Sequence, residues 1–373
     1  YLIFIFFCIL FSLYFAEGYF VYKYINNFNT SLEDRKLNIT KKYNDYLNLK
    51  KKYRNIEIRV LPKDFLNEEN QKLLPLSTFS NKKIFNCNEN GYYPLWDSDR
   101  FGFNNPDYLW NKNEFEYLII GDSYAMGQCV YERNSISGNL RALFPNNTVI
   151  NLAIAGNGPL LEFATLKEYT HIVNPNKILW FFSEVNDLSD LLKESKNKIL
   201  MDYFLKDNFS QNLVMRQNEI NDKLNEKLSK SLSEIKNEKT IHLKFDIPRF
   251  IKLYTLRELT INTIFKKEDP LDSKFKEIML KAKIFAEKNN AEFYFIYLPQ
   301  FSRYSSYYSY PNFKNSKKII KIINDLNIKL INIHDELFAK QPDPLIFFPF
   351  RSNGHYNENG YKQIAIIIHD KIN

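Results

Sequence analysis

The chain opens with an unbroken apolar stretch. Residues 1–16 carry no charge, and with GYFVY after Glu17 the stretch extends to residue 22. A helix of about 20 apolar residues spans the hydrocarbon core of a bilayer, which is roughly 30 Å thick. The stretch lacks a small-x-small cleavage motif, and aromatic residues cluster at its far end. We therefore expect residues 1–22 to form a transmembrane anchor, with a cleaved signal segment as the alternative.

Two polar segments follow the apolar stretch. Residues 23–60 alternate Lys, Asn, Asp and Tyr with sparse Leu and Ile, which predicts a polar helical stalk. Residues 61–112 are irregular and rich in proline and turn residues, which predicts a loop-rich lead-in packed on the main domain.

From residue 113 the pattern changes to short apolar runs separated by amphipathic stretches. This alternation is typical of a parallel β-sheet with crossover helices. The predicted strands are residues 117–121, 149–155, 177–182, 292–298 and 328–333. The predicted helices are residues 135–144, 160–172, 274–289, 315–326 and 359–371. We expect residues 113–373 to be an α/β domain, a flavodoxin-like three-layer sandwich with a central five-stranded parallel sheet. Ligands bind at the carboxyl ends of the strands in such folds.

A charged segment without strand-like alternation interrupts this domain at residues 188–271. We interpret it as a helical insertion. Because it follows a strand end directly, it could overhang the site as a lid or collar. A surface elaboration with no catalytic role is the alternative.

Composition and charge exclude several classes of protein. Of 373 residues, 45% are hydrophobic and 16% aromatic, too many for a disordered chain. The net charge is +8, but the lysines are dispersed among Asn and Ile along the whole chain. The one dense basic run, residues 41–54, alternates with Tyr, Asn and Leu and reads as a solvated helix. We therefore expect no nucleic-acid partner.

The cysteines suggest a disulfide. Besides Cys8 in the apolar stretch, the chain has only Cys87 and Cys129. A pair in an exported chain is a disulfide candidate, and closing the intervening loop would stabilise the fold by about 4 kcal/mol in the chain-entropy model. Two buried thiols are the alternative. No His/Cys/Asp cluster has metal-ligand spacing, and no phosphate-binding or dinucleotide-binding glycine motif occurs, so we expect neither metal nor cofactor.

Residues suited to nucleophilic catalysis follow the predicted strands. The first strand ends in Gly121-Asp122-Ser123 and the pattern then becomes helical, which places Ser123 on a tight strand-to-helix turn. Such a turn exposes the hydroxyl beside the backbone N–H groups of a helix N-terminus. Taken alone, the motif is equally compatible with a helix cap. Gly156 follows the second strand, Asn186 follows the third, and His355 lies in a turn-rich segment near the C-terminus.

These four residues, in this order, resemble the blocks of the SGNH (GDSL-type) hydrolase superfamily. The resemblance covers residues 113–373 and implies that Ser123 is the nucleophile and His355 its general base. It further implies an oxyanion hole formed by the Ser123 N–H, the Gly156 N–H and the Asn186 side chain.

The sequence departs from the family pattern at two places. Family members usually have Asp two or three residues before the histidine, where this chain has Asn353 and Ser352, and Glu184 stands where a glycine is usual. The missing acid matters because the third member of a triad fixes the tautomer of the imidazole. A Ser/His dyad oriented by a backbone carbonyl or Asn353, orientation by Asp343, and an inactive site are the three possibilities.

The expected function is carboxylic-ester hydrolysis through an acyl-serine intermediate. The resemblance implies an ester-bearing substrate, and a membrane-anchored chain on the export side suggests O-acyl groups of envelope glycan or lipid. An O-acyltransferase of the same fold is one alternative, and a catalytically inactive binding or assembly protein is the other.

Overall fold

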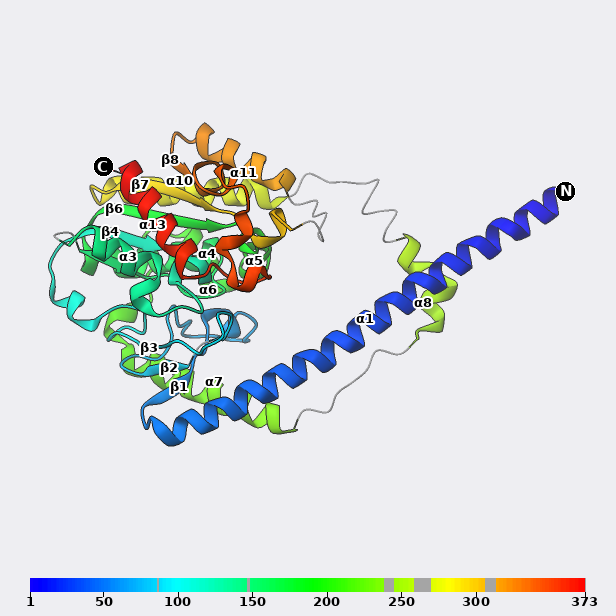
Figure 1. Cartoon of the computed structure of the whole chain (residues 1–373), viewed down its shortest axis with the longest axis horizontal. Coiled ribbons are helices and arrows are strands. Elements are labelled where there is room, and N and C mark those ends of the chain that lie inside the picture. The colour runs from blue at the N-terminus through cyan, green and yellow to red at the C-terminus, as the bar shows by residue number, and fades with distance from the viewer. Residues whose placement is uncertain (86, 146–147, 238–244, 258–269, 306–312, 373) are drawn as a thin grey trace. The chain divides into compact units, whose positions relative to one another are not determined.

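The computed structural model describes residues 1–85, 87–145, 148–237, 245–257, 270–305 and 313–372 (Figure 1). The chain divides into two compact units. One comprises Tyr1–Lys51 with Ser229–Pro270, and the other comprises Lys52–Leu228 with Leu271–Asn373.

The elements have the following bounds. The helices are α1 Leu2–Lys52, α2 Ser123–Met126, α3 Ile136–Leu143, α4 Pro159–Val173, α5 Asp187–Glu194, α6 Lys198–Leu205, α7 Gln217–Asn237, α8 Ile247–Ile251, α10 Pro270–Lys288, α11 Phe313–Asp325, α12 Ile333–Glu336 and α13 Glu358–Ile372. The strands are β1 Ile56–Ile58, β2 Lys83–Phe85, β3 Leu95–Asp97, β4 Phe115–Ile120, β5 Val149–Asn151, β6 Pro175–Ser183, β7 Glu292–Leu298 and β8 Lys329–Asn332. Short 3₁₀ helices include η1 Pro62–Phe65 and η5 Phe301–Arg303.

The first unit is built on α1, one continuous helix. Its part Leu2–Asn26 has a mean hydropathy of 2.0 and is long and apolar enough to cross a membrane. A signal sequence would have the same length and composition. Within this unit α8 lies against α1, because the Tyr14 hydroxyl donates to the Ile251 carbonyl at 3.0 Å. Glu17 of α1 accepts hydrogen bonds from the backbone N–H groups of Thr255 and Leu256 at 2.9 and 2.8 Å.

The second unit contains the five-stranded sheet that the sequence predicts. Its strand order is β5-β4-β6-β7-β8 and every neighbouring pair is parallel, which is the flavodoxin-like order. All five predicted strands are present, and the predicted fold class is confirmed. The strand β5 is shorter than predicted because Asn151 turns the chain, its side-chain oxygen accepting the Ala153 N–H at 2.9 Å.

Helices cover both faces of this sheet. On one face, α3 and α13 share a buried cluster with Tyr117, Ile119, Leu179 and Phe181 of the strands. On the other face, Phe275 of α10 packs against Phe182 and Phe295, and α4 packs against β4. Alternating side chains of β4 and β6 are therefore buried in both directions, which explains why these strands read as continuous apolar runs.

The segment before the sheet is more ordered than its sequence indicates. The strands β1, β2 and β3 form a separate small sheet in which β1 and β2 are parallel and β2 and β3 antiparallel. Each strand has three residues, too few for a recognisable alternation of apolar and polar positions. Arg59 follows β1 directly in the chain, and η1 begins three residues later.

The predicted insertion is helical in the part that the structure describes. It contains the end of α5, then α6, α7 and α8. Residues 238–244 and 258–269 of the insertion lie outside the described residues.

Carboxyl groups are buried beneath the end of the sheet, and Glu162 in the first turn of α4 is the extreme case. Glu162 has no exposed surface, and neither carboxyl oxygen has a hydrogen-bond partner among the described residues. Burial and the nearby carboxyl groups of Asp187 and Asp122 raise the pKa of Glu162 well above its usual value. The neutral form of this side chain is therefore favoured more strongly than in an exposed glutamate.

Replacing Glu162 by Met should raise the free energy of unfolding, and this increase should be larger at higher pH. In the wild type the unfolded state releases this proton above about pH 4.5 whereas the folded state retains it, so the free energy of unfolding falls with increasing pH. Removing an unsatisfied buried polar group should gain about 1–3 kcal/mol at pH 8 and less at pH 5. Denaturant titrations at both pH values measure this, with Glu277→Met on the exposed face of α10 as control. An equal effect of Glu162→Met at the two pH values would contradict the assignment.

Candidate active site

Ser123 lies where β4 turns into α2. Gly121 makes the turn possible, because a Cβ atom there would lie 2.6 Å from the Cβ of Ala125 and 3.0 Å from that of Phe181. Asp122 caps the short helix by accepting the Tyr124 N–H at 2.9 Å. The hydroxyl of Ser123 therefore sits at the carboxyl edge of the sheet, in a side chain that is 8% exposed.

His355 contacts Ser123 directly. Its Nε2 lies 2.9 Å from the Ser123 Oγ, although the two residues are 232 positions apart. Tyr124 fixes this approach in two ways. Its ring packs on the imidazole with a centroid distance of 4.7 Å, and its hydroxyl donates to the Gly354 carbonyl at 3.2 Å.

Glu89 occupies the other side of the imidazole. Its Oε1 and Oε2 lie 2.9 and 3.1 Å from the His355 Nδ1, and Oε2 also accepts the His355 backbone N–H at 2.7 Å. A carboxylate at Nδ1 assigns the proton to that nitrogen and leaves Nε2 free to accept the Ser123 proton. Burial raises the pKa of Glu89, but the hydrogen bonds and charge of His355 outweigh this and hold that pKa below its usual value.

The carboxylate at His355 Nδ1 therefore belongs to neither of the two residues that the sequence suggested. Asp343 forms an ion pair with Arg351 at 2.8 Å and accepts the Leu345 N–H at 3.1 Å. Asn353 lines the pocket, but the described contacts of His355 Nδ1 are with Glu89. The expectation is corrected because the acid comes from the lead-in segment, 266 positions away in sequence, and not from the histidine loop.

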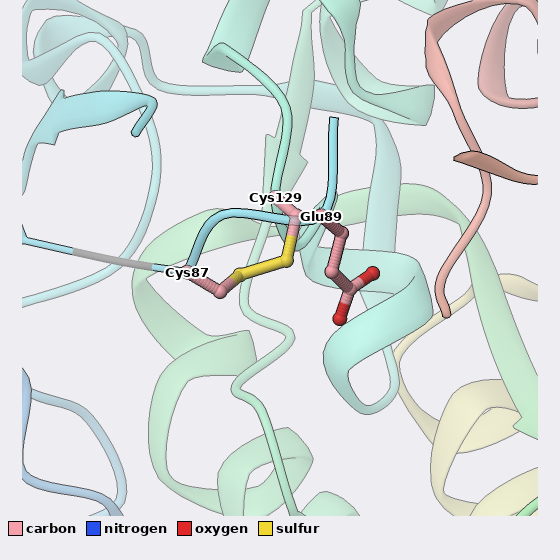
Figure 2. Close-up of side chains that lie close together, drawn as sticks. All are labelled: Cys87, Glu89 and Cys129. Atoms are coloured by element: carbon pink, nitrogen blue, oxygen red, sulfur yellow. A yellow bond between two sulfur atoms is a disulfide. The ribbon is translucent and has the colours of Figure 1, made fainter. Parts of the chain in front are cut away.

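A disulfide holds Glu89 near the catalytic turn. Cys87 and Cys129 are bonded, with Cα atoms 5.2 Å apart, and Figure 2 shows Glu89 beside the bridge. The Asn90 side chain adds a hydrogen bond of 3.0 Å to the Cys129 carbonyl. On the histidine side, Gly354 must lack a side chain, because a Cβ atom would lie 2.9 Å from Glu89 Oε2. Although Cys87, Glu89 and Cys129 lie close together, the disulfide and the His355 contact occupy their ligand atoms, so the group does not suit a metal ion.

Gly156 and Asn186 line the same pocket as Ser123 and His355. Gly156 has φ of +75°, a conformation in which glycine is favoured. Asn186 is the N-cap residue of α5 but makes no capping hydrogen bond with its side chain, and its Nδ2 donates to Asp190 Oδ2 at 2.6 Å. The side chain therefore lies at the pocket wall with one amide hydrogen bonded to the first turn of α5, which leaves the second amide hydrogen for a ligand.

The pocket around these residues has a volume of about 620 Å³. Its lining is mixed polar and apolar. It comes from the stretch between β1 and η1, the turns after β4 and β5, the end of β6 with the start of α5, the loop after β7, and the histidine loop. The lining residues are Arg59, Leu61, Lys63, Ser123, Tyr124, Gln128, Ala155, Gly156, Val185, Asn186, Ser189, Asp190, Lys193, Gln300, Phe301, Ser302, Asn353, Gly354 and His355. From the insertion, Ser189, Asp190 and Lys193 contribute.

Glu184, at the position where the family pattern has glycine, supports the wall of the pocket. Its carboxylate accepts hydrogen bonds from the Tyr297 hydroxyl at 2.8 Å and the Gln300 N–H at 3.1 Å, and it pairs with Arg303. These contacts fasten the loop after β7 to the end of β6. The departure from the pattern is thus accommodated by a buried ion pair.

Comparison with solved structures finds several to which the chain is distantly similar. It is similar to a psychrotrophic esterase, EstA, from Pseudoalteromonas sp., with 13% identity and a TM-score of 0.35 over 70% of this chain and 97% of that one. It is similar to a lipase/acylhydrolase from Enterococcus faecalis, with 12% identity and a TM-score of 0.39 over 69% and 95%. It is also similar to a putative lipolytic protein of the G-D-S-L family from Desulfitobacterium hafniense, with 10% identity and a TM-score of 0.36 over 69% and 99%.

These similarities carry no residue roles to this chain, because identities and TM-scores are low. No model of a protein family matches the sequence, and no curated protein does. The assignment of roles therefore depends on the distances between the atoms of this chain.

Replacing Glu89 by Gln should slow turnover strongly. The amide can donate a proton to Nδ1, which would move the imidazole proton to Nε2 and block acceptance of the Ser123 proton. We expect kcat on 4-nitrophenyl acetate to fall by roughly 10²–10⁴-fold. The variant Glu89→Asp should retain more activity, and Asp343→Asn should behave as wild type. Loss of activity in Asp343→Asn with none in Glu89→Gln would reverse the assignment.

Replacing Asn186 by Ala should lower kcat and leave the melting temperature nearly unchanged. An amide that donates to a developing oxyanion contributes about 2.7–4 kcal/mol to the transition state, and its removal lowers kcat by about 10²–10³-fold. Ser189→Ala, at the same wall of the pocket, is the matched control. If Asn186→Ala kept its kcat and melted at a lower temperature, Asn186 would be a structural residue.

Proposed function

We propose that this protein is a serine esterase in which Ser123, His355 and Glu89 form the catalytic triad. The observation that carries the proposal is the continuous hydrogen-bonded path from Ser123 Oγ through the imidazole to the Glu89 carboxylate, at the edge of an open polar pocket. A nucleophile in contact with a base that an acid orients is the arrangement used for acyl transfer.

The proposed reaction proceeds in two halves. Ser123 Oγ attacks the ester carbonyl while its proton moves to His355 Nε2, and Glu89 remains ionised and stabilises the imidazolium. The N–H groups of Ser123 and Gly156 and the amide of Asn186 stabilise the oxyanion. The proton on Nε2 then passes to the departing alcohol, which leaves an acyl-serine. Water then attacks the acyl-serine while its proton moves to His355 Nε2, and the imidazolium returns that proton to Ser123 Oγ as the bond to the acyl group breaks and the acid is released.

An alcohol acceptor in place of water would make the same site an O-acyltransferase, since both reactions share the acyl-serine. The reading as an inactive binding protein loses its main support, because it depended on the lack of an orienting acid. Glu89 fills that position.

The proposed location is the export side of a membrane, with the apolar part of α1 as the anchor. Its length and hydropathy support this, and so does the disulfide, since disulfides persist in oxidising compartments. An O-acyl group on an envelope glycan or lipid is the substrate class that such a location provides.

A fluorophosphonate probe tests whether Ser123 is activated. Such probes react with a serine whose hydroxyl a neighbouring base deprotonates, so the wild-type protein should be labelled and Ser123→Ala should not. The pocket serine variant Ser302→Ala should label as wild type. Circular dichroism and melting temperature confirm that each sample is folded. Failure of the folded wild-type protein to react would refute the proposed function.

A further inference from the structure

Positive charge exceeds negative charge in the wall of the pocket. Arg59, Lys63 and Lys193 line it, against one carboxyl group, that of Asp190. Asp190 already pairs with Lys193 at 2.7 Å and accepts the Asn186 amide at 2.6 Å. Two cations, Arg59 and Lys63, therefore remain without a neutralising carboxylate in the pocket.

Arg59 is a partly buried cation with most of its donors unused. Its Nη1 donates to Gln128 Oε1 at 2.9 Å, and among the described residues this is its one hydrogen bond; it has no ion pair there. Burial lowers the pKa of Arg59 to about 10, with Asp64 and Glu89 acting in the opposite direction. The nearby Glu89 carboxylate is engaged by His355, and that of Asp64 accepts the Leu61 N–H at 2.8 Å. The remaining guanidinium donors are thus available to a ligand.

The side chain of Lys63 lies in the wall of the pocket, beside Gly156. A Cβ atom on Gly156 would be 2.6, 2.8 and 2.7 Å from the Cδ, Cε and Nζ atoms of Lys63. The side chain therefore runs along the backbone of Gly156, one of the proposed oxyanion donors. The Lys63 carbonyl accepts the Leu66 N–H at 3.3 Å, but the ammonium group of Lys63 has no ion pair or hydrogen bond among the described residues.

We propose that Arg59 and Lys63 form an anion-binding subsite that selects a substrate carrying a carboxylate, namely an O-acylated polysaccharide of uronic-acid type. The inference rests on the proposed esterase function and specifies its substrate. A guanidinium fork matches a carboxylate with two parallel hydrogen bonds. Both cations come from the stretch between β1 and the end of η1 and lie in the same pocket as Ser123, so the acidic group and the ester belong to one bound molecule.

The rest of the pocket favours a sugar over a lipid. The side chains of Gln128, Ser189, Gln300, Ser302 and Asn353 line it and offer hydrogen bonds to hydroxyl groups. A site for a long acyl chain would be lined mainly by apolar side chains. A short acyl group on an acidic sugar fits this combination of cations and amides.

Binding to the full-length Ser123→Ala protein tests the subsite without turnover. The probes are tri-galacturonate and its fully methyl-esterified form, in which each carboxylate charge is removed and replaced by a small methyl ester. We expect tri-galacturonate to bind at least tenfold more tightly, and its affinity to fall with added salt. Arg59→Gln and Lys63→Gln, each introduced separately, should remove most of this preference. Arg216→Gln removes a positive charge outside the pocket and should keep it.

Hydrolysis provides a second readout. In Arg59→Gln and Lys63→Gln, the ratio of kcat/KM for O-acetylated tri-galacturonate to that for 4-nitrophenyl acetate should fall at least tenfold. Equal binding of the two trisaccharides, or an unchanged preference in both variants, would overturn the subsite even if 4-nitrophenyl acetate is hydrolysed. Tighter binding of phosphatidylglycerol vesicles or inorganic phosphate than of tri-galacturonate would overturn the assignment to a sugar acid. Failure to hydrolyse either ester would instead refute the proposed function, and the binding arm would still decide the subsite.

Discussion

The contact between Glu89 and His355 is the constraint on which the rest of the site depends. The carboxylate binds both the ring nitrogen and the backbone N–H of His355, so it sets the tautomer and the position of the ring together. Only in that tautomer does Nε2 face Ser123 as an acceptor. The sheet provides a serine, a glycine and an asparagine at strand ends, but without this contact nothing among the described residues would hold the imidazole proton on Nδ1.

Three further features maintain the contact against the desolvation of a partly buried carboxylate. The disulfide joins the loop that carries Glu89, between β2 and β3, to the turn after α2. Tyr124 holds the histidine loop, and Gly354 leaves room for the carboxylate. Each acts on a different side of the pair. Together they place the two groups at hydrogen-bond distance before a substrate arrives, so that little reorganisation is required during the reaction.

Features that a short stretch of sequence determines, such as the strands and the residues at their ends, could be predicted. Contacts between residues far apart in the sequence could not. The strands that precede Ser123, Gly156 and Asn186 are recognisable because runs such as YLII and KILWFF place apolar side chains on both faces of the sheet. The carboxyl ends of parallel strands meet at one edge of the sheet, so the residues that follow these strands lie close together. Glu89 lies in a stretch of sequence with no hydrophobic periodicity, so no local pattern identifies it as a residue of the site. One signal was available: if Cys87 bonds to Cys129, six residues after Ser123, then an acid two residues from Cys87 lies close to the serine. Arg59 was missed for the same reason, because it follows a strand of three residues.

The small sheet before residue 113 changes what counts as the minimal catalytic fragment. By topology, the five-stranded sheet and its helices are a complete domain, and a fragment starting at residue 113 would contain every strand of it. By compactness, the unit begins at Lys52. That earlier boundary retains Arg59, Lys63 and Glu89, and so the electrostatics of the pocket are encoded upstream of the fold that holds the nucleophile. If this upstream segment were exchanged between related chains, the cations of the pocket and the carboxylate that contacts His355 would be exchanged together. The five-stranded sheet would stay the same.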